Sequence, residues 1–489
     1  MEQPLILALD IGTSSVRAAL YDAEANPISR ASVKIDRTLA ATADGGSEID
    51  ADEALSQVAA AIDAVLEKTR KIKGEVEYVA SCSFWHSLVG IDAKGKPTTK
   101  VFGWADTRSG NYTDVLRNKF DEKETHNRTG AMFHSSFWPA KLLWLRKDFP
   151  DVFAKTERWL SFSDYVALKL FGEATTSVSM ASGTGIFDIR KCDWDAELLR
   201  FLKIKPANLP LIVANDSDTF SLNRKYAKRW PRLASARWFL SVADGATDNV
   251  GAGCVTRSQA AIMVGTSGAM RVAYTGEPPE QIPDGLWCYR VDRQRVILGG
   301  ALSDGGGLYH WLKQNLLLPK DADERIAMRK PGSHGLAFLP FLAGERSTGY
   351  HETATGSILG LTSATESVDI LHAALESVAY RFAEIFERIN SVVKVKEVVA
   401  SGGALRESTV WTQIIADVLG RDLTLNSVPE SSSRGACLLA LESIGNAADK
   451  KTSDVSSGRI VRFNKERNIQ YTTLIEPHRR EYENLLAKY

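Results

Sequence analysis

The sequence has little that would indicate a disulfide framework, a zinc site or a membrane anchor. Its 489 residues include only five cysteines, an odd number without the paired spacing of metal ligands: Cys82, Cys192, Cys254, Cys288 and Cys437. This usage favours a reducing compartment. No apolar stretch approaches the roughly 20 residues needed to span a bilayer. The amino terminus lacks a basic leader, so we expect a cytoplasmic protein without a signal peptide.

Net charge is also absent. Lysine plus arginine equals aspartate plus glutamate, at 60 each, so no global field attracts nucleic acid or an anionic membrane. We expect neither as a partner, and any anionic ligand must be held by local geometry. The chain length predicts two or three domains.

The chain contains a short duplication. Residues 5–20 read LILALDIGTSSVRAAL, and residues 260–274 read AAIMVGTSGAMRVAY. Each copy predicts an apolar strand, a Gly-Thr-Ser turn and a second apolar strand. Such a turn can hold a phosphate, because glycine permits close approach and the backbone N–H groups form an anion-binding concavity. Two copies suggest two related domains that grip one polyphosphate.

The two copies differ at one important position. The first carries Asp10 just before its turn, where the second carries Met263. A carboxylate that ends a buried strand needs a partner. A metal ion bound to a phosphate is one such partner.

The order of predicted elements repeats as well. The first half shows strands over 5–9, 16–21 and 28–33, a helix over 52–68 and a strand over 77–81. The second half has further strands after its hairpin, then a helix over 368–389 and a strand over 397–401. This order predicts an α/β fold with mixed sheets and packed helices. We expect domains at 1–250 and 251–489, with an insertion over 133–238 and a ligand cleft between the domains.

Four motifs occur in a fixed order along the chain: the two Gly-Thr-Ser turns, VADGA at 242–246 and ASGGA at 400–404. In this combination the chain resembles the FGGY family of carbohydrate kinases, from Asp10 to about Leu439. The resemblance implies two duplicated ribonuclease-H-like domains, the ATPase fold of actin, hexokinase and the 70-kDa chaperones. It also implies ATP and Mg²⁺ as cofactors and a small sugar or sugar acid as substrate.

The resemblance assigns roles to individual residues. Asp244 matches the catalytic base, which takes the proton of the attacking sugar hydroxyl. It is also a candidate to bind the substrate and, together with Asp10, to bind Mg²⁺. The residues expected to bind the nucleotide are Gly12, Thr13, Ser14, Gly265, Thr266, Ser267, Gly306, Gly403, Ala404 and Ser408. A simple turn at Asp244 and a plain strand-to-helix turn at Gly403 are the structural alternatives.

The expected substrate pocket comes from the first domain. His86 matches a histidine that the family places against a substrate hydroxyl. Trp104, Asp106 and Arg108 resemble a segment in which an aromatic ring covers one sugar face and charged groups bind hydroxyls. The alternatives are a core tryptophan and an Asp106–Arg108 ion pair that only stabilises the fold.

Several stretches are similar to the gluconate-kinase branch of the family, among them 104–109, 264–271 and 341–347. A sugar acid needs a cation for its carboxylate, and Arg108 and Arg271 are candidates, although each could instead form a structural ion pair. The chain departs from that branch at 302–304, at 134–137 and at Trp85, so a pentulose or polyol such as xylulose is the alternative acceptor. A non-catalytic sugar or nucleotide sensor is disfavoured, because Asp10 and Asp244 are both present. A homodimer is compatible with the sequence.

Overall fold

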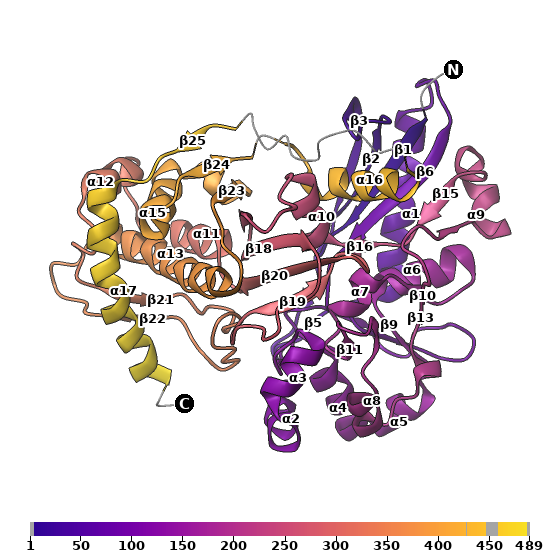
Figure 1. Cartoon of the computed structure of the whole chain (residues 1–489), viewed down its shortest axis with the longest axis horizontal. Helices are drawn as coiled ribbons and strands as arrows, with labels where there is room; N and C mark the ends of the chain where they lie inside the picture. Colours follow the sequence, from indigo (N-terminus) through magenta and orange to yellow (C-terminus); the bar gives the residue numbers. More distant parts are fainter. Residues whose placement is uncertain (1–3, 427, 446–457, 487–489) are drawn as a thin grey trace.

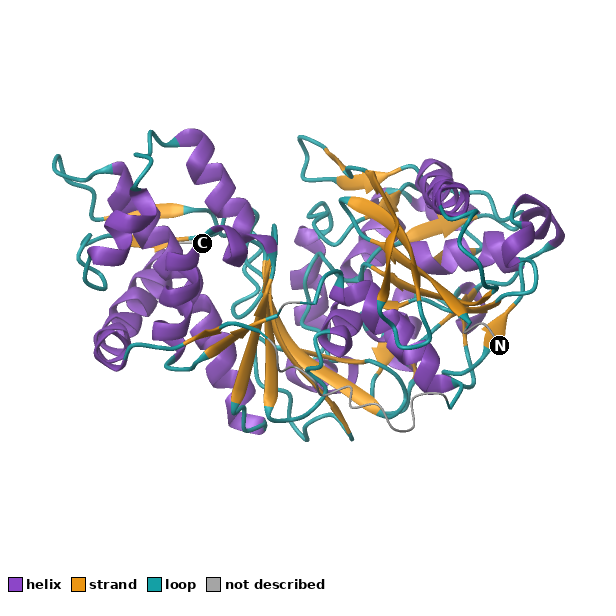
Figure 2. Ribbon diagram, turned by 90° about the horizontal axis from the view of Figure 1, so that it is seen from above, coloured by secondary structure: helices purple, strands orange, loops and turns teal. Residues whose placement is uncertain are grey.

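The computed structural model describes residues 4–426, 428–445 and 458–486. The chain forms two lobes that lie side by side, each built around a twisted seven-stranded sheet with helices packed on it (Figures 1 and 2). We call them the first and the second lobe, in chain order. The expected α/β class and the duplicated architecture are confirmed.

The sheet of the first lobe has the order β14-β15-β6-β1-β2-β3, with β16 also paired to β6. Buried β1 is antiparallel to β2, with Leu7 opposite Leu20, and parallel to β6, with Ala8 opposite Ala80. Helix α1 begins at the N-cap Asp50 and buries its apolar side. The bounds are β1 (Leu5–Ile11), β2 (Ser15–Tyr21), β3 (Pro27–Asp36), α1 (Ala51–Lys68), β6 (Val76–Ser83), β14 (Thr219–Phe220), β15 (Arg237–Phe239) and β16 (Val242–Ala243).

The sheet of the second lobe repeats this pattern, in the order β19-β20-β18-β17-β23-β24-β25. β17 is antiparallel to β18 and parallel to β23, as β1 is to β2 and β6. The bounds are β17 (Gln259–Val264), β18 (Gly268–Thr275), β19 (Trp287–Arg290), β20 (Arg295–Leu302), α11 (Gly306–Asn315), α12 (Ala322–Met328), β21 (Ala337–Leu339), β22 (Ser357–Leu359), α13 (Ser367–Val392), β23 (Glu397–Ser401), α14 (Gly403–Glu407), α15 (Thr409–Leu419), β24 (Leu423–Leu425), β25 (Ile460–Val461) and α17 (Lys465–Leu486).

The segment between β6 and β15 extends the first lobe with short helices and small sheets. Its own apolar cluster centres on α4 and includes Trp138 and Trp159. The elements are β7 (Val89–Ile91), β8 (Val101–Phe102), α2 (Thr113–Lys119), α3 (Glu122–Thr129), α4 (Trp138–Asp148), α5 (Pro150–Lys155), β9 (Arg158–Leu160), α6 (Phe162–Phe171), β10 (Thr175–Thr176), α7 (Val178–Ser182), β11 (Phe187–Asp188), β12 (Asp193–Trp194), α8 (Ala196–Leu202), β13 (Leu211–Ile212) and α9 (Arg224–Arg229). β8 pairs with β5 (Ser47–Ile49), which pairs with β4 (Ala40–Ala41).

All five cysteines are free thiols. Within the described ranges, none of the helices combines the length and the apolar character that a membrane span requires.

Two helices connect the lobes. Helix α10 (Asp244–Gly251) follows β16 of the first lobe, and α16 (Ser431–Ser443) follows β24 of the second. Yet α16 packs on the sheet of the first lobe, where Cys437 joins an apolar cluster with Ala80 and Cys82. Figure 1 shows this gold helix beside the indigo strands.

The two helices meet in backbone contact. A Cβ atom on Gly251 would lie 1.8 Å from the Ser431 carbonyl oxygen, and one on Gly435 would lie 1.8 Å from that of Thr247. No side chain fits at either position without a shift of the backbone. The junction between the lobes is therefore a tight helix crossing.

We predict that Gly435→Ala lowers the free energy of unfolding by about 1–3 kcal/mol, because the added methyl forces α10 and α16 apart. Denaturant titration measures the change. Ser432→Ala, at a neighbouring partly exposed position of α16, is the control and should stay within about 0.5 kcal/mol of the wild type. Equal stability of the two variants would contradict the close crossing.

Candidate active site

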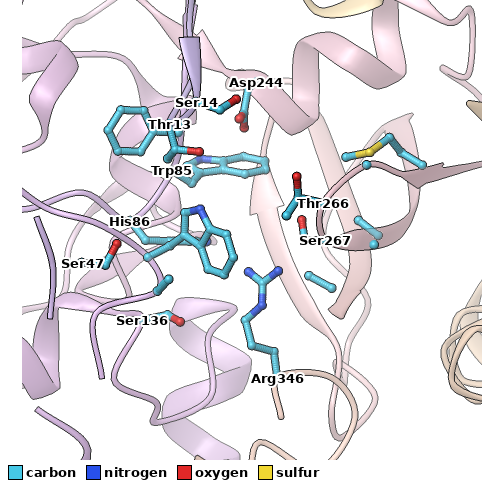
Figure 3. Close-up of a pocket in the computed structure, with 18 of the residues that line it drawn as sticks. Thr13, Ser14, Ser47, Trp85, His86, Ser136, Asp244, Thr266, Ser267 and Arg346 are labelled. Carbon is cyan, nitrogen blue, oxygen red and sulfur yellow. The ribbon is translucent and has the colours of Figure 1, made fainter. Parts of the chain in front are cut away.

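One cavity of about 460 Å³ lies between the lobes and takes its lining from both. Thr13 and Ser14 of the first Gly-Thr-Ser turn line it together with Thr266 and Ser267 of the second. Figure 3 shows these hydroxyl groups around the same space as Asp244. The structure thus brings together, at one cavity, residues that lie about half the chain apart.

Each turn is closed by its own backbone. The Gly12 N–H donates to the Ser15 carbonyl at 3.0 Å, and the Gly265 N–H donates to the Ser267 carbonyl at 3.0 Å. The bond spans three residues in the first turn and two in the second, but each turn joins two antiparallel strands, so the sequence duplication is also a structural one. Small side chains and backbone groups at both tips are suited to contact phosphate oxygens.

The amino end of α11 is fixed to the second turn. The Gly306 N–H donates to the Gly265 carbonyl at 2.7 Å, and the Gly307 N–H donates to the Thr266 carbonyl at 2.9 Å. A Cβ on Gly306 would lie 2.5 Å from the Gly265 oxygen and 2.8 Å from the Ala404 Cβ. Glycine is required here by close approach, and Gly306 and Ala404 lie together as the nucleotide assignment expects.

Two carboxylates belong to the candidate site: Asp244 lines the cavity, whereas Asp10 is buried and is not among the lining residues. Asp10 is the penultimate residue of β1, with Oδ2 3.5 Å from Arg17 Nη1, and burial raises the pKa of its carboxyl. Asp244 begins α10, and burial raises the pKa of its carboxyl from 3.8 to about 7. The positive charge of Arg271 lowers that pKa, and the negative charge of Asp10 raises it further. Two carboxylates whose pKa values are raised by burial suit a divalent cation, because the cation would stabilise their charged forms.

His86 is held as a neutral side chain. Burial lowers the pKa of its imidazole to about 3. Its Nδ1 lies 2.5 Å from the Gly183 carbonyl oxygen, which selects the tautomer with hydrogen on Nδ1. Nε2 is then an acceptor for a hydroxyl proton. The ring packs edge-on against Phe137 and Tyr289, with centroid distances of 4.9 and 5.7 Å.

The expected sugar-binding segment divides into two parts. Trp104 lines the cavity, whereas Asp106 and Arg108 do not. Arg108 Nη2 lies 2.6 Å from both Asp106 Oδ2 and Glu48 Oε2, and Asp106 also accepts the Ser47 N–H at 3.0 Å. These charges therefore hold the loop that presents Trp104.

The expected adenosine motif lies between β23 and α14. Gly402 has a φ of +108°, which favours glycine. A Cβ on Gly403 would meet nothing within 4 Å, so open space lies beside this backbone. Ser408, in contrast, is fully buried as the N-cap of α15. Its hydroxyl donates to Asp323 Oδ2 at 2.8 Å, so it is used within the fold and does not face the cavity.

Two arginines in the cavity lining were not recognised as site residues from the sequence. Arg37 donates from Nε to the Gly12 carbonyl at 2.8 Å, beside the first turn. Arg346 comes from the second lobe, and its Cζ lies 4.4 Å from the centre of the Trp104 ring in the first lobe. Arg346 stood inside the 341–347 stretch that resembles gluconate kinases, but nothing in that pattern shows that it reaches across the cleft.

The raised pKa of Asp244 affects how the free energy of unfolding depends on pH. Because its carboxyl ionises less readily in the folded chain, its charge destabilises the fold increasingly as pH rises from 3.8 toward about 7. We predict that Asp244→Asn raises the free energy of unfolding at pH 8 in EDTA, by on the order of 1–3 kcal/mol. The gain should shrink as pH falls and vanish below about pH 4.

Denaturant titrations across this pH range measure the effect. Asp248→Asn is the matched control, because Asp248 pairs with Arg271 at 3.2 Å and its loss should lower stability. A lower stability of Asp244→Asn at pH 8 would contradict the unfavourable burial of this charge.

Comparison with known proteins agrees with the geometry. Residues 5–250 match the N-terminal domain, and residues 260–443 the C-terminal domain, of the "FGGY family of carbohydrate kinases". Gluconokinase of Bacillus subtilis (strain 168) is 27% identical over 455 residues, which cover 90% of this chain and 88% of that protein.

Solved structures show the same similarity. The crystal structure of gluconate kinase from Lactobacillus acidophilus aligns with a TM-score of 0.90 and 26% identity, covering 100% of this chain and 99% of that one. Ligand-bound xylulose kinase from the same organism aligns with a TM-score of 0.89 and 27% identity, over 99% of both chains. Kinases for a sugar acid and for a ketose are thus similar to this chain to nearly the same degree.

Proposed function

The chain belongs to the FGGY family of carbohydrate kinases, and on that premise we propose that it transfers the γ-phosphate of ATP to the primary hydroxyl of gluconate, yielding 6-phosphogluconate. Kinases of this family use ATP and a sugar substrate. The observation that carries the proposal is the single cavity shared by both Gly-Thr-Ser turns and the Asp244 carboxylate.

Asp244 is proposed as the catalytic base. The substrate hydroxyl attacks the γ-phosphorus, the bond from that phosphorus to the bridging oxygen breaks, and ADP leaves. The hydroxyl proton passes to Asp244 in the transition state. A pKa raised to about 7 by burial suits a base at neutral pH. His86 Nε2 would accept a hydrogen bond from another substrate hydroxyl and so orient the acceptor.

We propose that Asp10 and Asp244 hold Mg²⁺, which neutralises charge on the phosphates when it is bound. Their two carboxylates, each with a pKa raised by burial, are a suitable donor set. The nucleotide would lie along Gly12–Ser14, Gly265–Ser267, Gly306 and Gly403–Ala404. A cytoplasmic location is supported by the five free thiols.

Gluconate is favoured as acceptor by the gluconate kinases among the similar proteins. Xylulose is the second candidate, because a xylulose kinase aligns almost equally well. A coupled assay of ADP release over aldonates, ketopentoses and polyols separates the two. Saturable turnover with a ketose, together with only background hydrolysis in the presence of every sugar acid, would exclude gluconate.

We predict that Asp244→Ala lowers kcat by about 10²–10⁴-fold, because the hydroxyl proton loses its acceptor. Calorimetry should show that ADP still binds, since the phosphate turns remain intact. Asp114→Asn, at an exposed carboxylate of α2, is the control and should keep wild-type turnover. Turnover by Asp244→Ala at the rate of this control would contradict the base assignment.

A further inference from the structure

We propose that Arg346 binds the carboxylate of the acid substrate and makes this kinase prefer sugar acids to neutral sugars. This inference rests on the proposed function. It assigns the carboxylate to a residue of the second lobe, whereas the base Asp244 and His86 come from the first.

Arg346 lies on the segment between β21 and β22 and lines the cavity. Its guanidinium stacks over Trp104, and Figure 3 shows the group pointing into the cavity. Nη2 makes a long hydrogen bond of 3.3 Å to the Leu302 carbonyl, and Nε has no hydrogen-bond partner. Among the described residues, no carboxylate forms an ion pair with Arg346. A guanidinium stacked on an aromatic ring, with its end directed into the cavity, suits a planar carboxylate.

The direction of Arg346 relative to Asp244 suits an acceptor whose two ends differ in chemistry. In Figure 3 the Asp244 carboxylate and the Arg346 guanidinium enter the cavity from opposite ends, with Trp85 between them. A six-carbon aldonate carries its primary hydroxyl and its carboxylate at opposite ends of an extended chain. When the hydroxyl lies at Asp244, the carboxylate is directed toward Arg346.

The other arginines near the cavity are committed elsewhere. Arg108 is held by Asp106 and Glu48, outside the cavity lining. Arg271 also lines the cavity, but it pairs with Asp248 and lies beside Gly245, directly after the base.

Arg37 also lines the cavity, but at the phosphate end. Besides its bond to the Gly12 carbonyl, its backbone N–H donates to the Ser14 carbonyl at 3.0 Å. Its guanidinium lies 5.5 and 5.4 Å from the ring centres of Phe84 and Phe162. It is therefore placed to act on the phosphates and not on the far end of the acceptor.

The segment that carries Arg346 is fixed on both sides. The preceding Glu345 is buried, forms an ion pair with Arg381 and accepts hydrogen bonds from the Tyr482 hydroxyl of α17 at 2.8 and 2.9 Å. On the other side, Glu352 Oε1 accepts the Ser135 N–H of the first lobe at 2.8 Å. These contacts hold the guanidinium in place before substrate arrives. An acid bound by His86 and Arg346 would bridge the lobes and favour their closure.

The test compares gluconate with D-glucitol, which replaces the carboxylate by a hydroxymethyl group. We expect Arg346→Met to lower kcat/KM for gluconate, mainly through KM, by roughly 10- to 100-fold more than for glucitol. If glucitol is turned over too slowly, its inhibition constant replaces kcat/KM. Arg346→Lys keeps the charge but cannot form a bidentate contact, so the decrease in its kcat/KM for gluconate should be intermediate.

Three controls keep the outcome interpretable. Arg37→Met should lower kcat for both acceptors and leave their ratio unchanged, because it acts at the phosphates. Arg70→Met, at an arginine that is 65% exposed, should resemble the wild type in both assays. Thermal unfolding of each variant identifies losses caused by misfolding.

The possible outcomes distinguish the role of Arg346 from the identity of the acceptor. An equal loss for both acceptors in Arg346→Met, or no loss for gluconate, would overturn the role of Arg346 while gluconate kinase activity stands. A wild-type enzyme that phosphorylates ketoses but no aldonate would overturn both the acceptor and the role of Arg346. A decrease in kcat/KM that is selective for gluconate, and larger in Arg346→Met than in Arg346→Lys, supports the inference.

Discussion

The backbone contact between α10 and α16 is the constraint on which the active site depends. The glycine contacts at Gly251 and Gly435 leave no room for side chains, so the two helices are held at a fixed separation. Asp244 is the first residue of α10, and α16 packs on the sheet whose strand β1 carries Asp10. The same crossing that joins the lobes therefore sets the position of the base relative to the first phosphate turn.

The site keeps its charges at a cost in stability. Asp10 is buried and Asp244 is partly buried, and each has a raised carboxyl pKa. A fold selected for stability alone would place neutral side chains here. The unfavourable charge has a chemical use, because a carboxylate with a pKa near neutrality can accept a proton during the reaction. The negative charge of Asp10, which raises the pKa of Asp244, also favours the binding of a cation.

Local patterns in the sequence predicted much of the fold. The helix expected over 52–68 is α1 (Ala51–Lys68), and the one expected over 368–389 lies within α13 (Ser367–Val392). Both have a continuous apolar side that sequence periodicity reveals. The strands on either side of each Gly-Thr-Ser turn were also predicted, because an apolar run that stops at a glycine turn is a local signal.

The local sequence patterns did not predict which distant elements contact one another. No local signal shows that α16 returns to the sheet of the first lobe, since its apolar residues would suit any core. Arg346 and Trp104 lie far apart in sequence and meet only across the cleft. Asp106 and Arg108 have the composition of a sugar-binding segment, but Glu48, a distant third charge, holds them outside the cavity. Which partner a charged side chain finds is decided by packing and not by the residues next to it.

The duplicated lobes differ in charge at one pair of corresponding positions. Asp10 is the penultimate residue of β1 and Met263 is the penultimate residue of β17, and each lies two residues before the glycine of its turn. A carboxylate at Met263 would direct a further negative charge at the phosphates held between the turns. The neutral side chain avoids that repulsion and leaves the second turn without a carboxylate, so that its hydroxyl and N–H groups can donate to the phosphates. One backbone design thus supplies acid-base chemistry from the first lobe, while the second supplies donors for anions: hydroxyl and N–H groups at its turn and, as we infer, the guanidinium of Arg346.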